Sequence, residues 1–233
     1  MDVMVGRDAG HIDDDLVVPA MDTIVATAPD VRVFNLSIGG APLDTLDPIA
    51  RRETLMKLQD LDNFAFARDI VLVIAAGNSW PGVVPNEPYP DHVEDPRWRL
   101  GSFALSFNGL VCGSYVDTLA PQGVAGTLGA PSPFTRIGPG MCDSPVPGLS
   151  APGGDGTENY EEAPATGPWV SNADGVWEDH AGTSLAAPLV AREAAWAVKE
   201  LALRCPPGTS PFSATVKAWL HLVAQRHPLT GAL

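Results

Sequence analysis

The stretch Gly182-Thr183-Ser184-Leu185-Ala186-Ala187-Pro188 decides the fold and is the most informative part of this sequence. It sets one hydroxyl, that of Ser184, at the expected start of a helix and surrounds it with small residues. The first turn of a helix leaves its backbone N–H groups unpaired, so Ser184 can turn both its Oγ and its own N–H toward one carbonyl. Such a serine can attack that carbonyl and stabilise the charge that develops on its oxygen.

On both sides of this stretch, apolar runs alternate with patterns of helical spacing. The alternation favours an α/β fold, a three-layer α/β/α sandwich with a mainly parallel sheet, as a single domain. Residues 79–98 carry Pro, Trp and acids without apolar periodicity and are interpreted as a surface excursion, and residues 121–168 as rich in loops. We expect strands at residues 3–5, 31–37, 70–75 and 110–115, and helices near residues 13–25, 55–65, 183–204 and 213–225.

The composition is that of a globular protein, with 45% apolar and 18% charged residues among 233. A formal net charge of −14 disfavours nucleic acid and anionic membranes as partners, because both are bound through clustered Lys and Arg. No apolar run approaches the length of a membrane span. The scattered Cys112, Cys142 and Cys205 indicate neither a disulfide framework nor a zinc site. An unpaired cysteine and no signal sequence weakly favour a cytoplasmic location over secretion.

Several further motifs stand in a definite order along the chain. Asn35-Leu36-Ser37-Ile38-Gly39-Gly40 comes first, followed by Ala75-Ala76-Gly77-Asn78, then the turn 133–139, the loop 149–154 and finally the stretch 180–191 around Ser184. In kind and order these motifs resemble those of the subtilisin-like serine peptidases (subtilases, peptidase family S8). The resemblance runs from about Val31 to Gln225.

Each motif has a simpler interpretation when it stands alone. Gly-Thr-Ser at a helix start is also the pattern of an N-cap, and Gly-Asn after a strand that of a turn. The functional interpretation is favoured over these simpler ones only because the motifs occur together in the order typical of the family. The serine motif is not the GxSxG of α/β-hydrolases, because Ala186 replaces the second glycine.

The resemblance implies a serine-type endopeptidase that acts on polypeptides through an acyl-enzyme on Ser184, without a required cofactor. Asn78 would donate its side-chain amide to the oxyanion, beside the N–H of Ser184. Backbone at Ser37, Ile38 and Gly39 would add the substrate as an extra strand. The small residues of the next motif would leave room for the P1 side chain, namely Ala75, Ala76 and Gly77.

The family's catalytic Asp and His motifs precede the serine, and neither motif occurs here. His11 stands too close to Asn35 for the chain that the family places between them, and His180 is expected on a strand or loop leading into the helix. His92, His221 and His227 are interpreted as surface or helix residues. We therefore expect that the sequence begins inside the catalytic domain, with Asp and His upstream, and that this chain alone is nearly inactive.

Two other hypotheses stay open. The first is a catalytically inactive pseudoprotease that binds peptides along the Ser37 to Gly39 edge without cleaving them. The second is a split enzyme, in which another polypeptide supplies the Asp and His.

The family often uses calcium to stabilise loops, and acidic residues between 155 and 162 are candidates for such a role: Asp155, Glu158, Glu161 and Glu162. The run lacks a defined ligand loop such as an EF-hand. A solvated acidic face is the favoured interpretation, so no metal site is predicted. Asp13, Asp14 and Asp15 are better explained as negative charge at a helix start.

Overall fold

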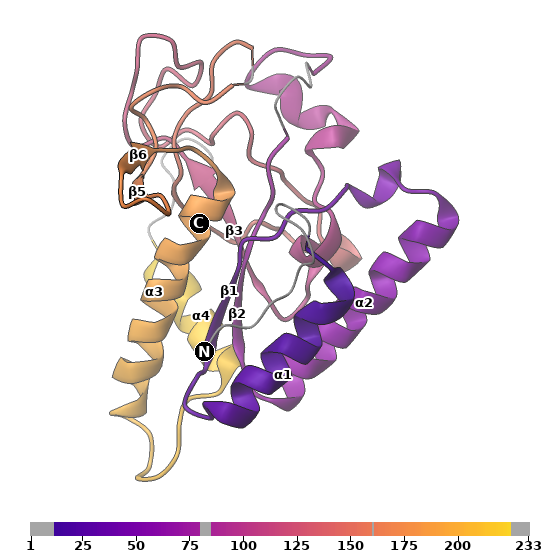
Figure 1. Cartoon of the computed structure of the whole chain (residues 1–233), viewed down its shortest axis with the longest axis vertical. Coiled ribbons are helices and arrows are strands. Elements are labelled where there is room, and N and C mark those ends of the chain that lie inside the picture. The colour runs from indigo at the N-terminus through magenta and orange to yellow at the C-terminus, as the bar shows by residue number, and fades with distance from the viewer. Residues whose placement is uncertain (1–11, 80–84, 160, 225–233) are drawn as a thin grey trace.

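The computed structural model describes residues 12–79, 85–159 and 161–224, and its centre is a four-stranded sheet (Figure 1). All three strand pairs are parallel, in the order β1-β2-β3-β4. The strands are β1 (Val33–Leu36), β2 (Val71–Ala75), β3 (Leu110–Tyr115) and β4 (Leu149–Pro152). The predicted strands around residues 31–37, 70–75 and 110–115 are thereby confirmed, whereas the one at 3–5 lies outside the described residues.

Strand β2 is the centre of the sheet and is buried along its whole length. Its side chains alternate between two cores, as the period of two in a strand requires. Leu72 and Ile74 face one core, while Val71, Val73 and Ala75 face the other. A parallel strand that is covered on both faces reads as a continuous apolar run, and this is the pattern in the sequence.

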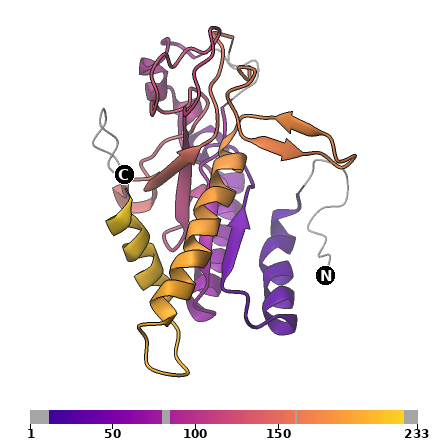
Figure 2. The same ribbon diagram turned by 90° about the vertical axis from the view of Figure 1, so that its left-hand side faces the viewer.

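Helices cover both faces of the sheet, so the predicted three-layer sandwich is confirmed (Figures 1 and 2). The helices are α1 (Val17–Thr27) and α2 (Pro48–Ala67) on one face, and α3 (Thr183–Ala202) and α4 (Ser213–Val223) on the other. Asp47 is the N-cap of helix α2, and its carboxylate accepts the N–H of Ile49 and of Ala50 at 2.8 and 3.0 Å. That cap satisfies two of the donors that a helix start leaves unpaired. None of the described helices combines the length and apolarity that a membrane crossing requires.

A hairpin projects from the sandwich just before α3 (Figure 2). It consists of β5 (Trp169–Ser171) and β6 (Trp177–Asp179), which pair antiparallel. No pattern in the sequence predicts this hairpin, because each of its strands is only three residues long. The loop-rich section before it also contains β4, which the motif comparison had treated as a loop.

The segment after β2 departs from its interpretation as a surface excursion. Trp98 and His92 are fully buried there, and both side chains reach the carbonyl oxygen of Pro133. The Trp98 Nε1–H donates to it at 2.8 Å, and His92 Nε2 lies 2.7 Å from it. Aromatic residues without periodicity here build a small core of their own, which periodicity alone cannot reveal. The remaining short elements are 3-10 helices: η1 (Asp14–Leu16), η2 (Leu43–Thr45), η3 (Asp91–Glu94), η4 (Pro96–Trp98), η5 (Ser102–Leu105) and η6 (Met141–Asp143).

Candidate active site

The candidate site lies where the carboxyl ends of β1 and β2 meet the amino end of α3. Parallel strands end at the same edge of a sheet, and in α/β folds this edge is where ligands bind. Ser37 follows β1 directly, Asn78 follows β2, and Ser184 is the second residue of α3. Hydrogen bonds join all three segments, so residues far apart in the sequence form one cluster.

Asn78 is held in one orientation by Thr183. Its Oδ1 accepts both the backbone N–H and the hydroxyl of Thr183, each at 2.9 Å. With its oxygen bound in this way, the amide nitrogen turns toward the start of α3. Asn78 Nδ2 lies 3.1 Å from the point where a β-carbon on Gly182 would stand. The glycine therefore leaves the space that this amide occupies.

Thr183 also organises the turn after β2. Its side chain is fully buried, and its Oγ1 accepts the backbone N–H of Gly77 at 3.1 Å. Gly77 has φ +93°, a left-handed conformation in which a side chain is strained. One threonine thus positions both Gly77 and Asn78, and the sequence analysis assigned it no role.

Ser184 is half-buried and carries two groups that are open for a ligand. The helical hydrogen bonds of α3 begin with the N–H of Leu185, which donates to Gly182 at 3.0 Å. Within the described part of the chain, neither the N–H nor the Oγ of Ser184 has a hydrogen-bond partner. A nucleophile, its N–H and a neutral amide from Asn78 are therefore brought together at one helix start.

Pro188 is the sixth residue of α3, and at this position it removes a helical donor. Its nitrogen would pair with the carbonyl oxygen of Ser184 in a regular helix but carries no hydrogen. Ser37 replaces that donor, because its hydroxyl donates to Ser184 O at 3.0 Å. The same hydroxyl oxygen accepts the side-chain amide of Asn35 at 3.0 Å.

The other predicted substrate-binding residues surround this cluster. Ile38 is half-buried and packs on the core beneath α1 and α2, whereas Gly39 is exposed with open space beside its α-carbon. Ala75 and Ala76 are both buried, one on each face of the sheet. Their methyl groups fill the two cores, and the backbone that follows them leads directly to Gly77.

Arg136 is a further residue at this edge that the sequence analysis did not single out. Residues 134–136 pair antiparallel with the turn after β2: Asn78 bridges Thr135, and the Arg136 N–H donates to Gly77 O at 3.1 Å. The Arg136 side chain lies along Gly77, with Cδ 3.3 Å from the position of a β-carbon there. Its only sequence signal is its place inside the turn motif at residues 133–139.

None of the described histidines is hydrogen-bonded to Ser184. His180 is exposed, and its ring lies 3.3 Å from Glu162 and 3.4 Å from Glu178. Hydrogen bonds to these carboxylates, Glu162 first, raise the pKa of His180. His221 is half-buried beside Gly148, and burial lowers its pKa. His92, expected at the surface or on a helix, is buried in η3, and His11 and His227 lie outside the described residues.

The interpretation of residues 155–162 as a solvated acidic face is wrong for Asp155. This carboxylate is completely buried, and burial raises its pKa. Its oxygens accept the N–H of Gly156 at 2.8 Å and of Ala125 at 3.4 Å, so the residue closes a loop. Among the residues that the structure describes, no group of three His, Cys, Asp or Glu side chains could hold a metal ion.

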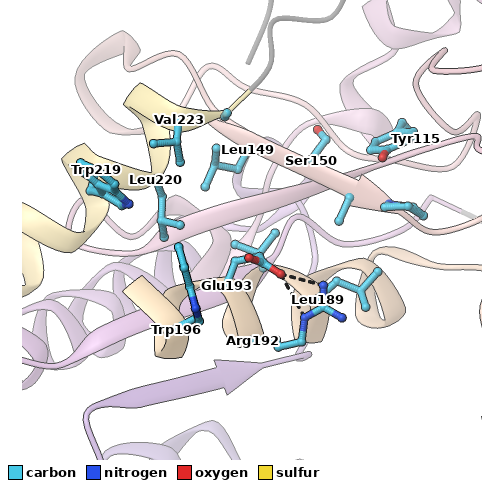
Figure 3. Close-up of a pocket in the computed structure, with 14 residues that line it drawn as sticks. Tyr115, Leu149, Ser150, Leu189, Arg192, Glu193, Trp196, Trp219, Leu220 and Val223 are labelled. Carbon is cyan, nitrogen blue, oxygen red and sulfur yellow. Dashed lines mark hydrogen bonds and ion pairs between the residues drawn. The ribbon is translucent and has the colours of Figure 1, made fainter. Parts of the chain in front are cut away.

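A separate pocket of about 430 Å³ lies between α3, α4 and β4 (Figure 3). Its lining is largely apolar, with Leu149, Trp196 and Trp219 among its walls. Its charged pair is internally satisfied, because Arg192 donates to Glu193 Oε1 at 3.0 and 2.6 Å. Ser184 and Asn78 do not line this pocket, so it is distinct from the candidate site.

Comparison with known proteins identifies the fold and the family of the chain. The chain superposes on solved structures of a lanthipeptide protease (TM-score 0.64, 21% identity, 96% of this chain and 62% of that one) and of the prenylagaramide maturation protease PagA (0.60, 19%, 95% and 61%). It also matches the epidermin leader peptide processing serine protease EpiP from Staphylococcus aureus (0.59, 20%, 92% and 49%). At these identities the matches show a shared fold, and the chain spans less than two thirds of each structure. No curated protein sequence matches the chain. The model of the Subtilase family matches residues 4–223, and the chain therefore belongs to the subtilase family of peptidases.

Proposed function

We propose that this chain carries the nucleophile and oxyanion site of a subtilisin-type serine endopeptidase. The observation that carries the proposal is the Asn78–Thr183 pairing, which aims a neutral amide donor toward the start of α3 at Ser184. In the proposed reaction, Ser184 Oγ attacks the peptide carbonyl and its proton passes to a histidine base. The carbonyl oxygen gains the charge, and the Ser184 N–H and Asn78 Nδ2 donate to it.

Asn78 suits the proposed role because an amide donates directionally without carrying charge. An aspartate at this position would repel the oxyanion. The two hydrogen bonds from Thr183 fix which end of the side chain points outward, and such preorganisation is what makes an oxyanion donor effective. The cost of reorienting the amide at the moment of reaction is thereby removed.

In this proposal the catalytic Asp and His belong to sequence upstream of the described residues. Two observations support the idea. None of the described histidines is hydrogen-bonded to Ser184. Within the described sheet β1 pairs only with β2, which leaves its other edge open to a further strand. An edge strand presents unpaired N–H and C=O groups, so an upstream strand that carries a catalytic residue could pair with β1.

A fluorophosphonate probe tests the nucleophile in the full-length protein encoded by the source locus. We expect the probe to label the protein, and Ser184→Ala to abolish labelling, whereas Ser210→Ala, a serine remote in sequence, leaves it unchanged. Labelling that persists in Ser184→Ala would contradict the assignment. Reading the locus upstream of the Met1 codon for Asp-[Ser/Thr]-Gly and His-Gly-Thr-His motifs tests the origin of the other two residues.

The lack of a histidine beside Ser184 in the described structure also favours a second candidate function. Without a general base, a serine hydroxyl is a poor nucleophile, and the same site would bind peptides without cleaving them. This pseudoprotease binds peptides along the Ser37 to Gly39 segment. The probe separates the two functions, because a pseudoprotease with an intact fold remains unlabelled while it retains peptide binding.

A further inference from the structure

Arg136 spans the two backbone segments between which the proposed substrate side chain would enter. Its Nε donates to Ser79 Oγ at 3.1 Å, just after β2, and its Nη1 donates to the carbonyl oxygen of Gly40, just after β1. Gly77 makes this path available, since it presents no side chain to the arginine. The guanidinium therefore links the Ser37–Gly40 turn to the Gly77–Ser79 turn.

The charge of Arg136 has no counterpart among the described residues. The other partly buried arginines in that part of the chain each pair with a carboxylate: Arg32 with Asp69, Arg97 with Asp95 and Arg99 with Glu94. Among the described residues, the Arg136 side chain bonds only to a hydroxyl and a carbonyl, and burial lowers its pKa. In a chain with 28 acidic and 14 basic residues, an unpaired, partly buried cation is unexpected on composition alone.

An unpaired charge that is partly removed from water is costly unless an anion joins it. The two hydrogen bonds of Arg136 use Nε and Nη1, and no described residue accepts a hydrogen bond from Nη2. A guanidinium held at one side in this way presents its remaining donors in a fixed plane, and such a plane matches a carboxylate. The anion that fits this guanidinium is therefore small and planar, as a carboxylate is.

We infer that Arg136 selects substrates with an acidic side chain, Asp or Glu, at P1. The inference rests on the proposed function, because a P1 side chain reaches this gap only if the substrate lies along Ser37–Gly39 with its carbonyl at Ser184. Arg136 would then contribute in the same way to the ground state and to the transition state. Its removal should raise KM or Kd for acidic substrates more than it changes kcat.

Binding of short product-like peptides provides the test, since it does not require turnover. We would measure the Kd of acetyl-Ala-Ala-Ala-Glu and acetyl-Ala-Ala-Ala-Gln for the full-length protein by titration calorimetry. Glu and Gln have the same shape, so the difference reports charge. The Glu peptide should bind about tenfold tighter or more, as expected for hydrogen bonds to a charged group. The preference should weaken as salt is added.

Two substitutions separate recognition from support of the fold. In Arg136→Gln the Glu and Gln peptides should bind equally, with the Gln peptide close to its wild-type Kd, whereas Arg136→Lys should keep part of the preference. If Arg136→Gln fails to fold, the Kd values of the Glu and Gln peptides for the wild-type protein still test whether the site prefers a charged side chain. Equal binding of both peptides by the wild type, or binding of neither, overturns the inference.

Cleavage of a peptide library by the same protein distinguishes this inference from the proposed function. Cleavage chiefly after Asp and Glu supports both. Cleavage after other residues retains the endopeptidase and contradicts the role of Arg136. A Glu preference in binding without any cleavage retains the role of Arg136 and contradicts the endopeptidase.

Discussion

The hydroxyl of Ser37 takes the place of the backbone donor that Pro188 lacks, and so binds the end of β1 to the first turn of α3. Ser37 thus forms a contact within the fold as well as lying on the proposed substrate edge. Its position determines how far the Ser184 carbonyl, and with it the first turn of α3, lies from β1. A substitution at Ser37 should therefore alter the position of Ser184.

Replacement of Ser37 by Ala should lower the free energy of unfolding by about 1 kcal/mol, because the partly buried Ser184 carbonyl loses its donor. Urea unfolding of the full-length protein measures this change. Ser37→Thr keeps the hydroxyl and serves as the matched control, with a smaller loss. Equal stability of the wild type and Ser37→Ala would mean that water replaces the donor without cost.

Thr183→Val should reduce both stability and turnover, since the buried hydroxyl serves Asn78 and Gly77 together. Loss of the acceptor for the Gly77 N–H costs about 1 to 3 kcal/mol of stability. If Thr183 positions the oxyanion donor, kcat should fall while KM stays nearly constant, and Thr183→Ser should restore kcat. A purely structural role would instead lower the amount of folded enzyme and leave the kcat of the folded fraction unchanged.

In the endopeptidase proposed above, Asn78→Ala should lower kcat by about 10²- to 10³-fold, with little change in substrate binding. The oxyanion exists only near the transition state, so the loss of its donor is expressed in kcat. Asn78→Asp is the informative companion, because it keeps the acceptor for Thr183 but places negative charge at the site. It should be at least as slow as Asn78→Ala, and a rise in KM alone for either variant would argue against the oxyanion role.

Local patterns in the sequence predicted most of the sheet and the helices. Strand β2 reads as an unbroken apolar run, and α4 repeats apolar residues at helical spacing, so each can be recognised without tertiary information. The hairpin of β5 and β6 escaped prediction because its strands are short and exposed. The burial of Trp98 was not predicted because it depends on a hydrogen bond to the carbonyl oxygen of Pro133, which is far away in the sequence. No local pattern encodes such a contact.

The candidate site, too, could be predicted only in part from the sequence. Ser184 and Asn78 stand in motifs that can be read in sequence order, and the structure brings them together. The supporting contacts join residues that are far apart: Ser37 to the Ser184 carbonyl, Thr183 to Asn78, and Arg136 to Gly40. Each of these contacts depends on how three segments meet at one edge of the sheet, and that arrangement cannot be predicted from a single sequence.

The three cysteines should differ sharply in reactivity. All are free thiols in the structure, but Cys112 is buried in β3 and burial raises its pKa to about 12, whereas Cys142 is exposed. Because the thiolate is the reactive form, a maleimide at neutral pH should label Cys142 rapidly and Cys112 only after unfolding. Mass spectrometry of digests locates the label, and Cys142→Ser should remove the fast phase. Fast labelling of Cys112 in the folded protein would contradict its burial.

The ion pairs of His180 should give the fold a pH dependence of definite sign. Glu162 and Glu178 raise the pKa of this histidine above its ordinary value of 6.5, so the folded state binds the proton more tightly than the unfolded state. The resulting stabilisation is fully present below pH 6.5 and is lost as the pH rises through the raised pKa of the folded state. Because the side chain of His180 is 49% exposed, the effect is small and is best followed at the residue itself.

An NMR titration of the His180 ring should place its midpoint above 6.5 in the folded protein. Glu162→Gln should lower that midpoint more than Glu178→Gln, since the hydrogen bond to Glu162 is the largest cause of the shift. Asp174→Asn is the control, because it removes an acid from the same hairpin region that makes no contact with the ring among the described residues. A midpoint at or below 6.5 would show that His180 does not pair with Glu162 and Glu178 in solution. His180 would then be free to move relative to Ser184, and its exclusion as a catalytic base would have to be tested directly with His180→Gln.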